Sequence, residues 1–175
     1  YLAHPDSVDA SVVGVALNLA ARDGDLPLYE SYRLRLESAK IPSERARFLT
    51  ALGHFRNAEL MERALEYAVT GPLRPQEILT IPFNIRENDE TKDRVWQWFR
   101  DRYRGIVSRI PPYYMADLPN FAQCCDIQRS EGVRVFFNYP ETNVPGTQEE
   151  LDKVIEGNKD CAGLRERQGS VVEKY

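Results

Sequence analysis

Few residues of this 175-residue chain have the type and spacing that chemistry requires. A zinc site needs His, Cys or carboxylate ligands that converge, usually at helical or turn spacing. The two histidines, His4 and His54, lie far apart, and neither has a Glu or His partner four positions along. His54 follows Gly53 at the end of a predicted helix, where a cationic ring would interact favourably with the helix dipole. We therefore expect a structural His54 and no metal or other cofactor in this chain.

The cysteines are three in number, Cys124, Cys125 and Cys161. Neighbouring positions on a helix point about 100° apart, so a bridge between Cys124 and Cys125 would be strained. An odd count with one adjacent pair is a poor disulfide framework, which favours a reducing compartment. We expect three ordinary, half-buried thiols that pack as small apolar groups, and a cytoplasmic location. A redox-active pair is the alternative.

Other catalytic patterns are weak. Glycines never cluster into a phosphate-binding loop, and the serines lack a nucleophile motif; Ser43 and Ser130 stand where helix caps are expected. The carboxylates between Glu87 and Glu90 fit a solvated helix start better than an acid–base pair. The prediction is therefore that no residue here is catalytic, cofactor-binding or metal-binding, and the substrate-binding residues remain unnamed.

Composition limits the class of protein. Hydrophobic residues make up 42% and charged residues 29%, which is typical of a globular chain, and the net charge of −4 argues against nucleic-acid binding. No apolar run approaches the length of a membrane span, and the first residues lack the features of a signal peptide. The missing initiator Met and the abrupt end at Tyr175 lead us to expect a piece of a longer chain.

Apolar residues recur at helical spacing along nearly the whole chain, and no segment alternates as a strand would. In the first predicted helix these are Val8, Val12, Val15, Ala16 and Leu19. Helices are expected to begin near Asp6 or Ser7, Asp25, Ser43, Asn57, Pro75, Asn88 or Asp89, Asp117, Ser130 and Thr147. Pro82 should kink or break the fifth helix, and Gly163 should end the last. These patterns predict an all-α fold of about nine helices.

Helix pairs are predicted to start near residues 7, 43, 74, 117 and 147. Such intervals are typical of two-helix repeats that stack into a solenoid. We predict a single domain over residues 1–175, a right-handed α-α superhelix of irregular HEAT- or armadillo-like repeats. A globular helix bundle is the alternative.

The helix between Asn88 and Ile110 carries both tryptophans. At about 100° per residue, its apolar stripe centres near Phe99. Trp96 then points about 60° from that centre and Trp98 about 100° to the other side. We expect Trp96 in the core and Trp98 at its flank, where it covers the next repeat or contacts another domain.

A family resemblance rests on motifs spread over most of the chain. These are Ala51-Leu52-Gly53 with Leu60 and Leu65, then Arg74 and Gln76, Asn84, the Trp96, Trp98 and Tyr103 pattern, and Val135-Phe136-Phe137. Together they resemble the C-terminal helical domain of aminopeptidase N-type zinc metallopeptidases. Glu77 stands where Asp is usual in that family, and Arg102 where Asn is frequent.

The resemblance implies a parent enzyme with a His-Glu-x-x-His zinc site and a Gly-Ala/Met-Glu-Asn exopeptidase motif in an upstream domain. Neither motif occurs here, so no catalytic residue carries over, and zinc belongs to the implied parent. The domain would be a curved solenoid that packs over the catalytic domain of the same polypeptide, closes its chamber and helps select the peptide substrate. Two alternatives remain: a free-standing helical-repeat scaffold that binds a protein, and an independent enzyme that uses scattered carboxylates.

If another domain normally covers the solenoid, this chain should expose a contiguous apolar patch larger than roughly 300–600 Å². A uniformly polar surface would count against that arrangement.

Overall fold

The computed structural model describes Leu2 and residues 8–172, with side-chain positions as far as Gln168. These residues form nine helices and no strand, which confirms the all-α class and the predicted number of helices. The helices belong to two compact units, Tyr1–Asn88 and Asp89–Tyr175. His4, Asp6 and Ser7 lie outside the described residues. The handedness of the predicted superhelix stays a prediction.

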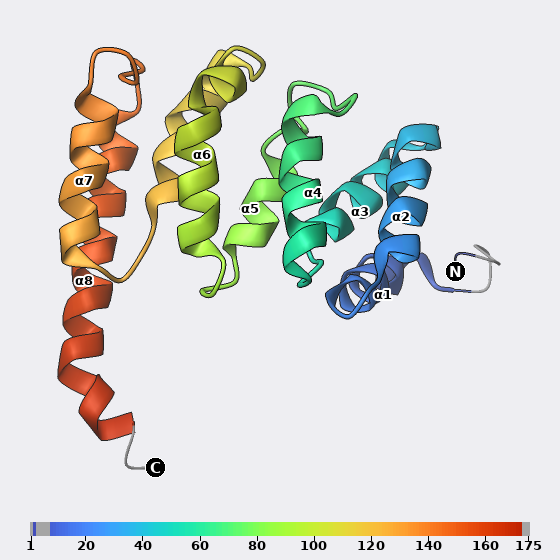
Figure 1. The fold of residues 1–175 in the computed structure, drawn as a ribbon, viewed down its shortest axis with the longest axis horizontal. Coiled ribbons are helices and arrows are strands. Elements are labelled where there is room, and N and C mark those ends of the chain that lie inside the picture. Colours follow the sequence, from blue (N-terminus) through green and yellow to red (C-terminus); the bar gives the residue numbers. More distant parts are fainter. Residues whose placement is uncertain (1, 3–7, 173–175) are drawn as a thin grey trace. The chain divides into compact units, whose positions relative to one another are not determined.

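The first unit contains α1 (Ala10–Arg22), α2 (Leu26–Ser38), α3 (Pro42–Leu52), α4 (Ala58–Thr70) and α5 (Thr80–Arg86). Helix α3 packs against α1 and α2, and α5 packs against α3 and α4 (Figure 1). Aromatic rings pack beside α2, where Tyr32 meets Phe48 of α3 edge to face at 5.4 Å, and Tyr29 meets Phe55, in the loop after α3, at the same distance. The predicted inward residues of α3 and α4 are all buried: Phe48, Leu49, Leu52, Phe55, Leu60, Met61, Ala64, Leu65 and Ala68.

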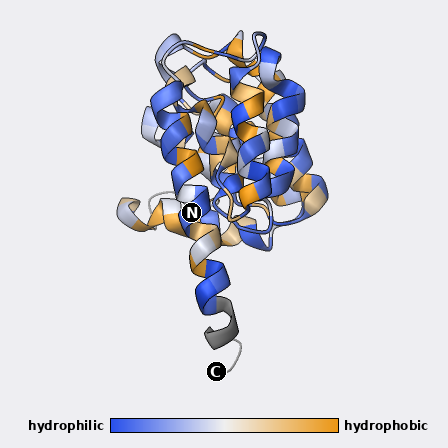
Figure 2. Ribbon diagram, turned by 90° about the vertical axis from the view of Figure 1, so that its left-hand side faces the viewer, coloured by the Kyte–Doolittle hydropathy of each residue, from blue (hydrophilic) through white to orange (hydrophobic). Residues whose placement is uncertain are grey.

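The second unit contains α6 (Lys92–Val107), the 3₁₀ segment η2 (Pro112–Ala122), α7 (Ile127–Asn138) and α8 (Gln148–Val172). Phe99 lies at its centre and stacks on Phe121 with ring centroids 4.5 Å apart. Trp96 is 6% exposed and contacts Phe99 and Phe137, so its predicted place in the core is confirmed. Trp98 is half-buried, and its indole N–H has no hydrogen-bond acceptor among the described residues. Figure 2, seen from the side of α7 and α8, shows apolar and polar residues alternating along the helices.

Two predicted helix caps are confirmed. The Asp25 carboxylate accepts a hydrogen bond from the amide of Leu28 at 3.0 Å, and Asn57 accepts from the amides of Glu59 and Leu60. Both side chains satisfy amides that the first turn of a helix leaves unpaired. The sequence therefore located the starts of α2 and α4 correctly.

Other helix starts differ from the prediction. Asp9, rather than Asp6 or Ser7, caps α1 and accepts from the amide of Ser11. Helix α3 follows Ile41, whose side chain has no acceptor atom for a cap, and it begins with Pro42, whose missing amide hydrogen costs nothing at that position. Ser43 therefore lies inside the helix.

The later helices are shifted as well. Thr91, rather than Asn88 or Asp89, precedes α6. Asp126 caps α7 through the amide of Arg129, and Ser130 is buried inside that helix with its hydroxyl bonded to the Asp126 carbonyl. A stronger acceptor four residues earlier thus replaced the predicted serine cap.

Two expected interruptions are also wrong. Residues 75–79 form turns and α5 begins only at Thr80, so Pro82 lies in its first turn, where proline removes no internal hydrogen bond. Helix α8 continues through Gly157 and Gly163 to Val172. Glycine weakens a helix without being obliged to end it.

Candidate functional site

Glu77, one of the two positions at which this chain departs from the family pattern, forms a buried ion pair with Arg45 in the first unit. Glu77 Oε1 accepts from Arg45 Nε at 2.7 Å, and Glu77 Oε2 accepts from Arg45 Nη2 at 2.8 Å and from the Arg74 amide at 2.9 Å. Arg45 Nη1 also donates to the Leu36 carbonyl at 2.7 Å. This buried pair joins α2, α3 and the turn before α5.

The pKa of Glu77 follows from these contacts. Burial by itself raises the pKa of this carboxyl, but the hydrogen bonds from Arg45 and the Arg74 amide outweigh it and hold the pKa below its ordinary value. Glu77 is therefore ionised at neutral pH and paired on both oxygens. A carboxylate in that state is structural and is poorly suited to act as a general base.

Gly53 and Asn84, two further motif positions, lie against each other. A Cβ at Gly53 would lie 2.5 Å from Asn84 Cβ and 2.9 Å from the Ile81 carbonyl oxygen. The Asn84 amide donates to the Thr80 carbonyl at 2.7 Å within α5. The close approach of α5 to the end of α3 therefore requires glycine at this position.

His54 is half-buried at the end of α3. Burial lowers the pKa of its imidazole, and Glu87 opposes this only in part, so the ring is neutral at pH 7. The structural role predicted for His54 stays a prediction. Within the part of the chain that the structure describes, no three His, Cys, Asp or Glu side chains gather as metal ligands would.

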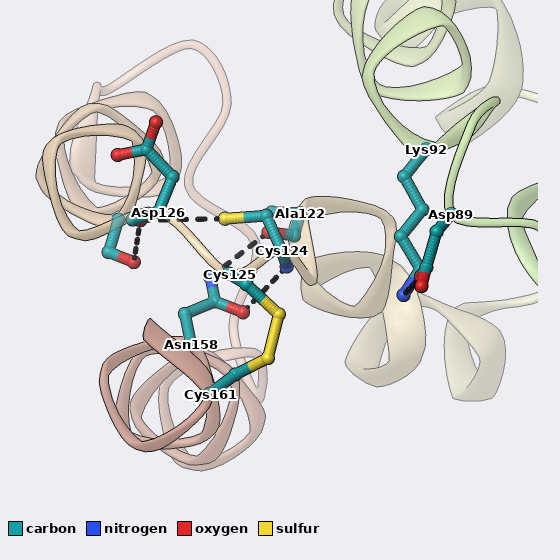
Figure 3. The surroundings of a disulfide bond; sticks show 9 residues. Asp89, Lys92, Ala122, Cys124, Cys125, Asp126, Asn158 and Cys161 are labelled. Carbon is teal, nitrogen blue, oxygen red and sulfur yellow. Dashed lines mark hydrogen bonds and ion pairs between the residues drawn. A yellow bond between two sulfur atoms is a disulfide. The ribbon is translucent and has the colours of Figure 1, made fainter. Parts of the chain in front are cut away.

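The cysteines are the largest correction in the second unit. Cys125, just before α7, forms a disulfide with Cys161 of α8, with Cα atoms 5.0 Å apart, and Cys124 remains a thiol (Figure 3). The expectation of three free thiols is wrong because the fold brings Cys161 beside the loop that carries the adjacent pair. The cysteine pattern consequently no longer supports a reducing compartment.

One face of α1 is apolar and exposed. Val12, Val15 and Leu19 are 51%, 61% and 55% exposed, and Ala16 lies exposed between them. The side chains that α1 does bury are Val13, Leu17 and Ala21. The stripe read from the sequence is therefore a surface rather than the core face. The sequence of α1 did indicate a second apolar face, because its apolar residues lie on nearly all sides of the helix. Such a pattern is typical of a helix that other protein covers on all sides.

A groove of about 690 Å³ lies along α7 and α8. Its wall includes the buried Ile155 and three exposed apolar side chains, Ile127, Val135 and Tyr139. Glu131, Arg134 and Lys159 supply charges. This groove was not predicted from the sequence, where Val135 stood out only as part of an aromatic motif.

No helix in the described part of the chain combines the length and apolar character that crossing a bilayer demands. The candidate sites are thus two surfaces, the exposed face of α1 and the groove along α7 and α8. Among the described residues, neither surface carries three His, Cys, Asp or Glu side chains placed to hold a metal ion.

Known proteins resemble this chain over most of its length. A family model described as the ERAP1-like C-terminal domain matches residues 1–158. Aminopeptidase 2, mitochondrial, of Saccharomyces cerevisiae is 28% identical over 108 residues, which is 61% of this chain and 11% of the relative. The alanine/arginine aminopeptidase of the same yeast is 28% identical over 106 residues, covering 61% of this chain and 12% of the relative.

The chain therefore corresponds to only a small part of these two enzymes. The family match covers both compact units and includes every motif that carried the sequence resemblance. The chain belongs to the ERAP1-like C-terminal domain family, and so to the C-terminal domains of aminopeptidases.

Proposed function

We propose that this chain is the non-catalytic C-terminal domain of a zinc-dependent aminopeptidase, which closes the catalytic chamber and helps select the peptide substrate. Its partners would be the catalytic domain upstream in the same polypeptide and the peptide itself. Family membership supports the assignment to an aminopeptidase, and the names of the two yeast relatives agree with it.

The observation that carries the proposal is the exposed apolar face of α1. Val12, Val15 and Leu19 together offer a stripe that is costly to leave in water, at roughly 25 cal/mol per Å² of apolar surface. Such a face on a helix that already packs on α3 indicates that further protein covers it. In the proposed enzyme, that cover is the polypeptide preceding this domain.

The zinc ion of the proposed enzyme would lie outside this chain. The described residues offer no group of ligands that fits it, and His54 is isolated as well as half-buried. In the proposed enzyme, the upstream domain would carry the catalytic roles as well.

The coding sequence upstream of Tyr1 tests the proposal directly. We expect a His-Glu-x-x-His motif and a Gly-Ala/Met-Glu-Asn motif there. An upstream sequence without the zinc motif would exclude the aminopeptidase assignment.

A second test uses aminoacyl-coumarin substrates. We expect no turnover by the purified 175-residue chain with or without added zinc, and turnover by the longer protein. Activity that persists through purification of the chain and depends on its own carboxylates would instead establish an independent enzyme.

A free-standing protein-binding scaffold is the second candidate, and the groove along α7 and α8 favours it. A groove of this size with apolar walls and charged edges suits a peptide segment of a partner. The upstream coding sequence separates the two candidates, because the scaffold needs no zinc motif. A cytoplasmic location remains a proposal, and one of the two yeast relatives is named as mitochondrial.

A further inference from the structure

We propose that the Cys125–Cys161 disulfide is a site of reversible thiol–disulfide exchange. Its reduction by a dithiol would release the C-terminal turns of α8 from the loop that precedes α7. The inference rests on the second unit alone and is independent of the proposed enzymatic role.

Two attachments join this loop to α8. The first is Asn158, which is 2% exposed; its Oδ1 accepts from the Cys124 amide at 2.8 Å, and its Nδ2 donates to the Ala122 carbonyl at 3.1 Å. The second is the disulfide, which leaves α8 about one turn further along, at Cys161 (Figure 3). The buried amide fixes the N-terminal part of α8 without help from the disulfide.

Burial of α8 ends at the same point. Leu151, Val154, Ile155 and Asn158 are buried, whereas residues 159–168 are exposed or half-exposed. Little apolar packing therefore holds the helix beyond Asn158. Segments with few buried contacts open locally at low free energy, so the covalent bond decides whether these turns stay docked.

The disulfide is accessible to a reductant. Both cysteines are half-exposed and line a hollow of about 270 Å³ beside α8, together with Lys92 and Lys153. These ammonium groups also pair with carboxylates, Lys92 with Asp89 and Lys153 with Glu149. The positive charges around the hollow are thus balanced by negative ones. A small dithiol that approaches the disulfide is neither strongly attracted nor strongly repelled by them.

The third cysteine does not compete for the bond. Burial raises the pKa of the Cys124 thiol, so its reactive thiolate is scarce at neutral pH. Its Sγ–H donates to the Asp126 carbonyl at 3.6 Å and points away from the disulfide (Figure 3). An attack from within the loop is disfavoured, and exchange must involve an external thiol.

The exchange has two steps. A thiolate of the dithiol attacks one sulfur of the Cys125–Cys161 bond, forms a mixed disulfide and releases the other cysteine as a thiolate. The second thiol of the reductant then displaces the remaining cysteine. The protein gains two electrons and two protons, and the dithiol leaves as its disulfide.

Thiol counting and trypsin cleavage test the proposal on the full 175-residue chain. After equilibration with oxidised dithiothreitol, alkylation and mass measurement should find one free thiol, and after reduced dithiothreitol, three. Reduction should raise cleavage at the exposed Arg165 and Arg167 by about tenfold or more, since the cross-link no longer limits local opening. Tryptophan fluorescence, which reports the packing of Trp96 around Phe99, should stay unchanged.

Two matched variants distinguish the loss of the Cys125–Cys161 bond from other effects of the reductant or of replacing a cysteine. Cys161→Ser should be cut rapidly with or without reductant, whereas Cys124→Ser should respond to reductant as the unaltered chain does. Three free thiols under oxidising conditions, or equal cleavage in both redox states, would overturn the proposal. A loss of native fluorescence on reduction would also overturn it, because the disulfide would then hold the whole unit together.

Discussion

Arg45 and Glu77 are 32 positions apart in sequence and form a buried ion pair in the first unit, with two hydrogen bonds between the side chains. Charged groups are retained in such places when hydrogen bonds replace the water that they lose. Here the guanidinium bonds to both carboxylate oxygens and to the Leu36 carbonyl, and the carboxylate also binds the Arg74 amide. The motif position at which this chain has Glu instead of Asp is therefore part of the framework.

Replacing Glu77 with Gln should cost roughly 3 kcal/mol in the free energy of unfolding, because Arg45 would keep its charge in a buried place without a counter-ion. Urea unfolding followed by circular dichroism measures this change. The control is Glu59→Gln, whose partner Arg63 lies on an exposed turn of the same unit. That loss should stay within about 0.5 kcal/mol. Equal losses would contradict the structural role of the buried pair.

The same carboxyl gives a pH dependence with a definite sign. Its pKa is lower in the folded protein than the ordinary 4.5, so its contribution is fully present above that value and is lost as the pH falls through the folded pKa. Stability should therefore decrease below about pH 4.5, and Glu77→Gln should flatten that decrease. Urea midpoints measured from pH 7 to pH 3 for both proteins show whether the slopes differ. Parallel slopes would mean that other carboxyls dominate.

The sequence could not predict this pair. Arg45 was one of 23 basic residues with no local feature to single it out, and its partner comes from a later segment. The aromatic positions were easier, because helical spacing alone placed Trp96 on the stripe around Phe99. Residue predictions succeeded where the local pattern decides burial and failed where partners come from distant segments, as with Cys125 and Cys161.

The predicted helix starts also succeeded where the local sequence is decisive and failed where it is not. Asp25 and Asn57 were identified because each stands directly before an apolar stripe, and Gly24 separates Asp25 from the preceding helix. Ser130 failed because Asp126, four residues earlier, is a rival cap, and the tertiary fold could use the longer helix. Where several polar residues follow one another closely, a single sequence does not determine at which of them the helix begins.

Gly53 provides a test of how closely α5 approaches the end of α3. Gly53→Ala should destabilise the protein by about 1–3 kcal/mol, since the new Cβ would meet Asn84 and the Ile81 carbonyl at distances that require a shift of the backbone. Gly157→Ala in α8 is the matched control. A Cβ at that position would meet no atom within 4 Å apart from its own helix backbone and chain neighbours, and alanine should stabilise the helix by about 0.5–1 kcal/mol.

Opposite signs for these two alanine substitutions, measured by thermal and urea unfolding, are the expected result. A neutral Gly53→Ala would show that α5 can move away without cost. Since Gly53 belongs to the motif that resembles the aminopeptidase family, the outcome also indicates whether that motif reflects packing.

At the scale of the molecule, the all-α class followed from the absence of strand alternation and the dense succession of stripes and caps. The orientation of α1 did not follow. Its apolar residues lie on nearly all sides, so periodicity could not decide which side packs on α3 and which side stays exposed. Which side of α1 is buried depends on the surfaces that the other helices offer to it, and the local sequence of α1 does not contain that information.

The exposed face of α1 gives the last prediction, which concerns the protein proposed to extend upstream. Val15→Lys combined with Leu19→Lys should change the free energy of unfolding of the 175-residue chain by at most about 0.5 kcal/mol per substitution, because both positions are more than half exposed. In the longer protein these lysines would be buried against the preceding domain, and desolvation of their charges should lower the melting temperature and speed proteolysis between the domains. Leu17→Ala is the control: its side chain is buried against the same unit, so a loss of about 2–5 kcal/mol should appear in both proteins. If the double lysine variant behaves alike in both, α1 is not the face that the upstream polypeptide covers.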